Sequence, residues 1–149
     1  MVAGRVGMGL AREALRNGEK AMATAQDVLD AKGSDVLWIE PLESVFEAAR
    51  LMNEHRVGAL LVQIDGHLVG IVSERDYISK VILDRAAAMR TKVSEIMTRE
   101  VITVTRETST QECIALMRDN HFRHLPVVES GRPVGIISLR DLFLSAIED

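Results

Sequence analysis

A serine followed three residues later by an aspartate occurs at two corresponding places in the chain. The first copy lies in Gly70–Asp76 (GIVSERD) and the second, 65 residues later, in Gly135–Asp141 (GIISLRD). In each copy, an apolar run that indicates a strand leads into a pattern that indicates a helix. A serine at a helix start lies beside free backbone N–H groups, and an ionised aspartate only accepts hydrogen bonds. The pair can therefore cap the helix, hold the ribose and phosphate of a nucleotide, or do both.

The elements that would position the first copy follow a simple order. Ser44 and Glu47 have the spacing of a helix N-terminal capping box, and Asp65-Gly66 is a strong hairpin-turn signal. The first unit is predicted to contain a strand over 36–39, a helix from 44, strands over 59–62 and 68–72, and a helix over 73–83.

The same order of elements recurs in the second half of the chain. Ser109 and Glu112 repeat the capping-box spacing. Without a gap, 14 of the 42 positions are identical between Val36–Tyr77 and Val101–Leu142. The second unit is predicted to contain a strand over 101–104, a helix from 109, strands over 124–128 and 133–137, and a helix over 138–147.

This internal repeat determines the expected fold class. Two β-α-β-β-α units predict an α/β fold of the α+β type, with the units related by a pseudo-twofold axis and packed through their sheets. We expect an N-terminal helical extension over residues 1–23, a first domain over 24–90 and a second over 91–149. Gly70 and Gly135 would leave room for a ligand or the paired strand to approach closely.

Composition restricts the possible functions. A net charge of −4 argues against non-specific nucleic-acid binding, and 3% aromatic residues leave few platforms for stacking bases. No apolar run approaches the roughly 18 residues of a membrane span. Cys113 is the only cysteine and falls on the apolar face of a predicted helix, which indicates a buried thiol in a reducing compartment. We expect a cytoplasmic protein, with an organelle matrix as the alternative because residues 1–20 are mildly basic.

Groups that could catalyse a reaction or hold a metal are scarce. No nucleophile, base and orienting group form a recognisable set, and the chain has no glycine-rich phosphate loop with a lysine. Of the four histidines, only His121 and His124 are close in sequence, and a predicted helix-to-strand turn would aim them apart. We therefore expect neither an enzyme nor a metal protein.

The two units resemble a known family. The phrases VGALLV, GIVSERDY, EIMT and HFRHLPVV are each typical of the cystathionine-β-synthase (CBS) domain, and two such domains in tandem resemble a Bateman module. The resemblance covers about residues 24–149 and includes the ordered set of motifs in both units. The chain looks like a standalone CBS-pair protein.

This resemblance implies where a ligand would bind. Modules of the family bind adenosine nucleotides in the cleft between paired units. Carried onto this sequence, Asp76 and Asp141 would accept hydrogen bonds from ribose hydroxyls, and Ser73 and Ser138 would contact ribose or phosphate. Residues that would border the adenine are Val57, Gly58, Ala59, Phe122, Arg123 and His124. Residues that would neutralise phosphate are Arg75, Arg123 and Arg140. Because Gly58-Ala59 corresponds to Arg123-His124, we expect unequal affinities or different ligands at the two sites.

Two functions are consistent with the residues and the resemblance. The first is a non-catalytic regulatory module that binds AMP, or alternatively ADP, ATP or NAD(H). Such binding would bias an unidentified protein target or the module's own homodimer. The alternative is a ligand-free scaffold for protein interaction or dimerisation, suggested by the apolar helix faces and the N-terminal segment.

Overall fold

The computed structural model of the chain describes residues 23–83 and 87–148. They form a continuous unit, Val36–Val101, and a discontinuous unit that joins the described residues up to Asp35 with those from Ile102 onward. Both units combine helices with a small sheet, which confirms the expected α+β class. Residues 1–22, which make up almost all of the predicted N-terminal extension, lie outside the described residues.

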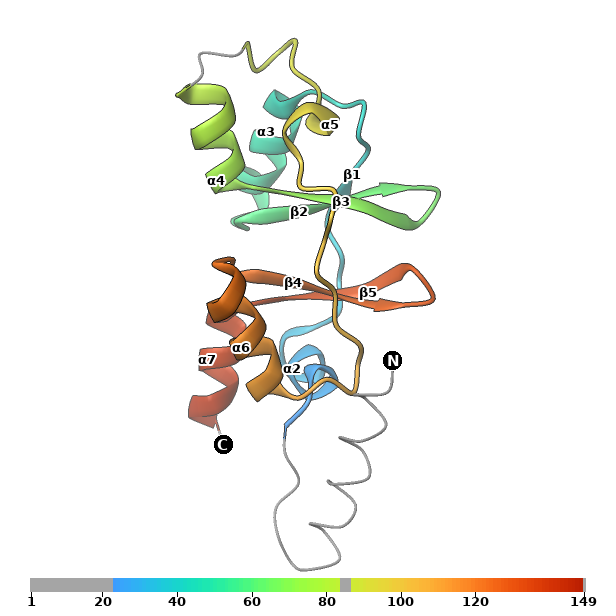
Figure 1. Cartoon of the computed structure of the whole chain (residues 1–149), viewed down its shortest axis with the longest axis vertical. Coiled ribbons are helices and arrows are strands. Elements are labelled where there is room, and N and C mark those ends of the chain that lie inside the picture. Colours follow the sequence, from blue (N-terminus) through green and yellow to red (C-terminus); the bar gives the residue numbers. More distant parts are fainter. Residues whose placement is uncertain (1–22, 84–86, 149) are drawn as a thin grey trace, which may run out of the picture. The chain divides into compact units, whose positions relative to one another are not determined.

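The continuous unit is built on a three-stranded sheet. Its elements are β1 (Trp38–Ile39), α3 (Val45–His55), β2 (Ala59–Ile64), β3 (His67–Ser73), α4 (Glu74–Tyr77), the π-helix η1 (Ile78–Ile82) and α5 (Val93–Ile96). β2 and β3 form an antiparallel hairpin, and β1 runs parallel to β2. Asp65 and Gly66 have φ of 51° and 79°, as a tight hairpin turn requires. Figure 1 shows α3, α4 and α5 on one side of this hairpin.

The discontinuous unit repeats this arrangement around a two-stranded sheet. Its elements are α2 (Ala25–Lys32), α6 (Thr110–Asn120), β4 (His124–Glu129), β5 (Arg132–Ser138) and α7 (Leu139–Glu148). The β4–β5 turn also has positive φ at both central residues, 52° at Ser130 and 77° at Gly131. Each hairpin carries a register shift at the same place, between Val62 and Gln63 and between Val127 and Val128.

The strand predicted over 101–104 does not form, and that prediction was wrong. Only Val104 pairs with β4: its N–H donates to the Pro126 carbonyl at 3.0 Å, and its carbonyl accepts from the Val128 N–H at 2.9 Å. The next ladder bond towards residue 102 would need a Pro126 N–H, which proline lacks. In the continuous unit Leu61 occupies the corresponding position and donates to the Leu37 carbonyl at 3.3 Å, so β1 forms there.

The two predicted capping boxes at α3 and α6 are only half formed. Ser44 Oγ accepts from the Glu47 N–H and Ser109 Oγ accepts from the Glu112 N–H, both at 3.1 Å. The Glu47 carboxylate binds Arg50 Nε at 2.9 Å instead of closing its box. The serine caps are therefore confirmed, and the reciprocal bond expected from Glu47 is not.

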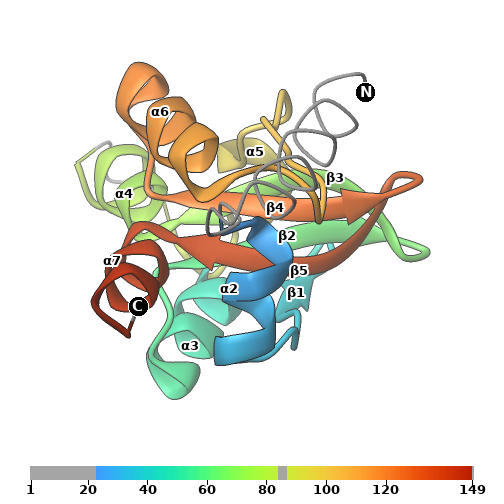
Figure 2. The ribbon, with the colours of Figure 1, turned by 90° about the horizontal axis from the view of Figure 1, so that it is seen from below.

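The helix that precedes each repeat in sequence packs with the other repeat. α2 precedes the first repeat, yet its Val28 and Leu29 are buried in the core of the discontinuous unit, and the helix lies along β5 (Figure 2). α5 precedes the second repeat, yet its Val93 and Ile96 are buried in the core of the continuous unit. The linear boundaries predicted at residues 24, 90 and 91 therefore cut across the two packed units.

Cys113 lies in the core of the discontinuous unit. Its side chain is fully buried on α6. Burial, with a smaller contribution from the charge of Glu112, raises the pKa of the thiol to about 11. A thiol in this state is neutral and poorly nucleophilic at neutral pH, which confirms the predicted core role.

The glycine before each serine–aspartate pair gives the preceding helix room to pack. A methyl group added at Gly135 would lie 2.6 Å from Cδ2 of Leu29 on α2, and one at Gly70 would lie 2.6 Å from Sδ of Met97 after α5. Both distances are too short for carbon contacts. Among the described residues, the close neighbour is thus Leu29 of α2 at Gly135 and Met97, just after α5, at Gly70, and not the paired strand that was one of the two expected neighbours. Close approach of a ligand, the other expectation, stays a prediction.

Gly135→Ala is expected to lower the free energy of unfolding by about 1–3 kcal/mol, because the added methyl group overpacks the contact with Leu29. The measurement is urea unfolding of Gly135→Ala, Leu29→Ala and the double variant. Because truncating Leu29 removes the clashing atoms, the double variant should lose clearly less stability than the two single losses added together. Additive losses would contradict the close contact.

Candidate ligand site at the two serine–aspartate caps

Each serine–aspartate pair forms a reciprocal cap where a strand passes into a helix. At the start of α7, the Ser138 N–H donates to Asp141 Oδ2 at 2.8 Å, and the Asp141 N–H donates to Ser138 Oγ at 3.1 Å. At the start of α4, the corresponding bonds between Ser73 and Asp76 are 2.9 and 3.3 Å. The capping interpretation is therefore confirmed in both units. The cap leaves each carboxylate with further capacity to accept hydrogen bonds.

A lysine that the sequence analysis did not identify contacts each aspartate. Lys32 Nζ lies 2.7 Å from Asp141 Oδ2 and donates to the Ile136 carbonyl at 2.8 Å. Lys80 Nζ lies 3.1 Å from Asp76 Oδ1 and donates to the Ile96 carbonyl at 2.8 Å. Each ammonium thus bridges the aspartate to a backbone carbonyl. The aspartate side chains are 17% and 14% exposed, so both ion pairs are partly shielded from water.

The two lysines reach equivalent aspartates from different elements. Lys80 follows Asp76 by four residues and belongs to η1, the π-helix that replaces the last part of the α-helix predicted over 73–83. π-helical turns are uncommon and occur frequently at functional sites. In the other unit the position corresponding to Lys80 is Ser145, and the ammonium comes instead from Lys32 at the end of α2.

The predicted flanking residues lie against the caps through backbone bonds. Ala59 pairs with Ser73 across β2 and β3, and His124 pairs with Ser138 across β4 and β5. The Gly58 carbonyl accepts from the first N–H of α4 at 3.0 Å, and the Arg123 carbonyl accepts from the first N–H of α7 at 2.8 Å. Each unit therefore brings its serine, aspartate and strand entry together, and Val57 and Phe122 are half-buried and packed against the cores of their units. Whether these residues border an adenine stays a prediction.

The arginines proposed for phosphate are on the surface. Arg75, Arg123 and Arg140 all have exposed side chains. Arg75 has an interaction of its own, so it is not a free cation. The lysines, in contrast, lie within ion-pair distance of the aspartates. A role for the arginines in neutralising phosphate stays a prediction.

The two sites differ electrostatically where Ala59 is replaced by His124. Burial lowers the pKa of the His124 imidazole, with Asp141 acting in the opposite direction and Lys32 and Arg123 lowering it further. The pKa of Asp141 is also lowered: burial acts to raise it, and the hydrogen bonds from Lys32 and Ser138 outweigh that effect. At neutral pH the site therefore holds a neutral imidazole beside an ionised carboxylate.

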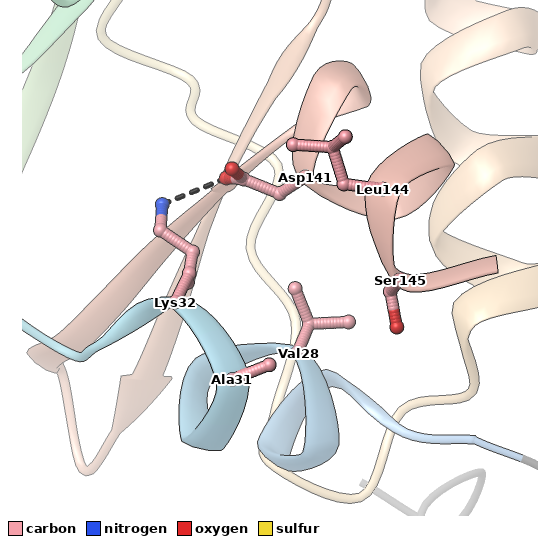
Figure 3. Close-up of a pocket in the computed structure, with 6 residues that line it drawn as sticks. All are labelled: Val28, Ala31, Lys32, Asp141, Leu144 and Ser145. Atoms are coloured by element: carbon pink, nitrogen blue, oxygen red, sulfur yellow. Dashed lines mark hydrogen bonds and ion pairs between the residues drawn. The ribbon is translucent and has the colours of Figure 1, made fainter. Parts of the chain in front are cut away.

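Each unit has a small pocket beside its cap. In the discontinuous unit a pocket of about 160 Å³ lies between α2 and α7, and Figure 3 shows Lys32 and Asp141 pointing toward one another at its edge. Its lining residues are Val28, Ala31, Lys32, Asp141, Leu144 and Ser145. In the continuous unit a pocket of about 250 Å³ lies between α3 and the helix formed by α4 and η1. Both are smaller than the ~300–1,000 Å³ of typical ligand sites, so each fits only part of a nucleotide.

Within residues 23–83 and 87–148, no helix is long and apolar enough to cross a membrane. No three His, Cys, Asp or Glu side chains within them converge in a way that could hold a metal ion.

The depressed pKa of His124 predicts how stability depends on pH. The unfolded chain binds a proton more readily than the folded one, so the free energy of unfolding should fall as pH drops below about 6.5, the ordinary histidine value. Asp141 stays ionised over this range because its pKa lies below 3.8. Urea unfolding at pH 7.5 and 5.5 should show a smaller difference for His124→Gln than for wild type. The matched exposed variant, His55→Gln, should keep the wild-type difference; an unchanged difference in His124→Gln would contradict the assignment.

Comparison with known proteins identifies the repeat. A family model described as "CBS domain" matches residues 24–82 and 93–147. CBS domain-containing protein CBSX3, mitochondrial, of Arabidopsis thaliana is 37% identical over 135 residues, which are 85% of this chain and 66% of that protein. YhcV of Bacillus subtilis is 33% identical over 125 residues, 82% of this chain and 86% of that protein. The chain thus spans just under two thirds of the plant relative.

Solved structures give the same result. The CBS-domain structure NE2398 has a TM-score of 0.81 and 41% identity, covering 85% of this chain and 98% of that one. A CBS-domain protein from Agrobacterium tumefaciens has a TM-score of 0.78 and 38% identity, covering 84% and 95%. The repeated cap, the doubled β-α-β-β-α order and these matches over both halves show that the chain belongs to the CBS-domain family and carries two CBS domains in tandem.

Proposed function

We propose that the chain is a non-catalytic regulatory module that binds adenosine nucleotides at its two serine–aspartate caps. CBS-domain proteins are in general regulatory modules that bind adenosine ligands. The observation that carries the proposal is the recurrence, in both units, of a partly buried aspartate with a lysine ammonium 2.7 or 3.1 Å away.

This arrangement suits a phosphorylated ribose. A vicinal diol offers two O–H donors, and a carboxylate offers two oxygen acceptors. The Ser138 N–H and Lys32 both use Asp141 Oδ2, so Oδ1 is the acceptor that these bonds leave available. A neighbouring ammonium attracts an anion, and partial exclusion of water strengthens that attraction. At each cap, a carboxylate that can accept from ribose hydroxyls thus lies next to an ammonium that can bind a phosphate.

The differences between the caps support unequal binding. The continuous unit presents Gly58 and buried Ala59 at its strand entry, and the discontinuous unit presents exposed Arg123 and half-buried His124. The cationic Arg123 side chain favours a ligand with more negative charge, and the larger Arg123 and His124 side chains narrow the space for a base. AMP is the ligand we favour, with ADP, ATP or NAD(H) as alternatives.

Regulation would act through a partner or through self-assembly. A ligand can signal only if it binds one conformation or complex more tightly than another. Ile78 and Phe143 occupy corresponding positions in the two repeats and are 53% and 59% exposed, which supports a homodimer in which they are covered. A separate protein target is the other possible receiver of the signal. Cytoplasm stays the proposed location, and the mitochondrial plant relative keeps an organelle matrix as the alternative.

Asp141→Asn and Asp76→Asn are each expected to weaken AMP binding at their own site by about 10- to 100-fold, because a charged hydrogen bond contributes about 1.5–3 kcal/mol. The measurement is isothermal titration calorimetry of AMP, ATP, NADH and S-adenosylmethionine into wild type and both variants. Asparagine keeps the size of the side chain, and a melting curve for each variant confirms that it is folded.

Asp119→Asn is the matched control, because Asp119 is an exposed aspartate on α6 whose ion pair is with the adjacent Arg118 and not with a cap lysine. It should bind AMP like wild type. Heat from no ligand, or AMP binding that both cap variants leave unchanged, would contradict nucleotide binding at the caps and favour the ligand-free scaffold.

A further inference from the structure

The two lysine–aspartate pairs are chemically alike but differ in what they connect. Lys80 and Asp76 lie four residues apart on one continuous helix, so their ion pair is internal to that helix, and only the Lys80 bond to the Ile96 carbonyl at 2.8 Å reaches α5. Lys32 and Asp141 are 109 residues apart and join the end of α2 to the start of α7. Of the two ion pairs, only the second therefore joins side chains of two separate helices and depends directly on the docking of α2 beside α7.

We propose that Lys32 is a specificity-determining residue that occupies Asp141 in the ligand-free protein and gives way only to a riboside that carries its own anion. This inference rests on the proposed function and adds to it the class of ligand that the Asp141 site selects. The ion pair between Lys32 and Asp141 then acts as a latch, which ligand binding opens.

The preference for a ligand with its own anion follows from the loss of the counter-charge of Lys32 when a diol binds Asp141. A diol can donate one O–H to the available Oδ1 of Asp141, but its second O–H needs Oδ2, which Lys32 Nζ and the Ser138 N–H already share. A diol that takes both oxygens therefore competes with Lys32. The Lys32 side chain is only 32% exposed and would lose its counter-charge. An unpaired, partly buried charge is unfavourable. A phosphate restores a partner for the ammonium, whereas an uncharged nucleoside does not.

Lys32 lies where α2 meets the segment that leads to the continuous unit, so opening of the latch affects that connection. It is the last residue of α2, and the helix ends at Gly33, whose N–H donates to the Leu29 carbonyl at 2.7 Å. Gly33 has φ of 100°, a conformation that glycine adopts without strain. Residues 33–37 then lead directly into β1 of the continuous unit. Release of Lys32 therefore loosens the turn from which this connection starts.

The pocket beside the Lys32–Asp141 ion pair has space for part of a ligand. Ala31 and Val28 of α2 and Leu144 of α7 form its apolar walls, and the ion pair closes one edge (Figure 3). Its volume of about 160 Å³ is several times the roughly 30 Å³ share of one water molecule in the liquid. Part of a ligand can therefore enter beside Asp141 without separating α2 from α7.

The first arm of the test needs no ligand. Hydrogen exchange of the Gly33 amide, followed by NMR, should be about two- to five-fold faster in Lys32→Met and in Asp141→Asn, as expected for loss of a partly exposed ion pair. The double variant should exchange no faster than either single variant, because both remove one interaction. Lys80→Met is the matched control and should leave Gly33 unchanged, and Lys32→Arg should restore slow exchange. Equal exchange in wild type and Lys32→Met would overturn the latch.

The second arm measures selection with AMP and adenosine as probes. Calorimetry is performed in the Asp76→Asn background, so that the Asp141 site is read alone. Lys32→Met should bind adenosine more tightly and AMP more weakly, lowering the ratio of AMP to adenosine affinity by about ten-fold. Normal AMP binding with an unchanged ratio would overturn this inference alone. Absence of AMP binding in wild type would overturn the proposed function and the ligand-operated part of the latch together, leaving Gly33 exchange to decide on the ion pair.

Discussion

The carboxylate of the capping aspartate is the point on which each unit depends. The carboxylate accepts a hydrogen bond from the serine N–H where the strand ends, and it forms an ion pair with a lysine of the same unit. The backbone N–H of the aspartate donates to the serine hydroxyl. Strand, helix and lysine therefore keep their relative positions through one side chain. That side chain is partly buried and negatively charged, so removing its partners is costly, while a ligand that replaces them can be accommodated. The proposed ligand contacts would use the same two oxygens as these structural contacts.

The repeat makes the two units similar, and single substitutions make them different. Pro126 in place of Leu61 removes one backbone donor and with it a third strand. Ser145 in place of Lys80 removes the local ammonium, and Lys32 supplies one from another helix. These substitutions change strand pairing and the source of the ammonium but leave the serine–aspartate cap intact in both units.

Sequence reasoning succeeded where the signal was local. The Asp65-Gly66 turn and the Ser138–Asp141 cap depend on residues within three positions of one another, and both are present. The prediction of a short strand over 101–104 was wrong although Pro126 is present in the sequence. An apolar run does not indicate which backbone donors its partner strand offers, and a proline in that partner offers none. The π-helical turn at Ile78–Ile82 has no comparable sequence signal.

The serines and aspartates of the candidate site were predicted from the sequence, and the two lysines that pair with the aspartates were not. Lys80 could have been found, because a lysine four residues after an aspartate on a helix faces it. Lys32 could not, because its contact with Asp141 spans 109 residues and depends on α2 packing with the more distant repeat. The predicted domain boundaries follow the order of the chain and do not reflect this exchange of leading helices, which is seen in the core residues of α2 and α5 and in the packing around Gly70 and Gly135.

The two capping carboxylates are proposed to be ligand acceptors as well as structural groups. The most direct measurement is the ¹³Cγ chemical shift of Asp76 and Asp141 while AMP is added to the full chain. Both resonances should move along saturable curves, and the exposed Asp119 should stay fixed. Shifts that are absent at both caps, or equal in size at Asp119, would contradict the claim.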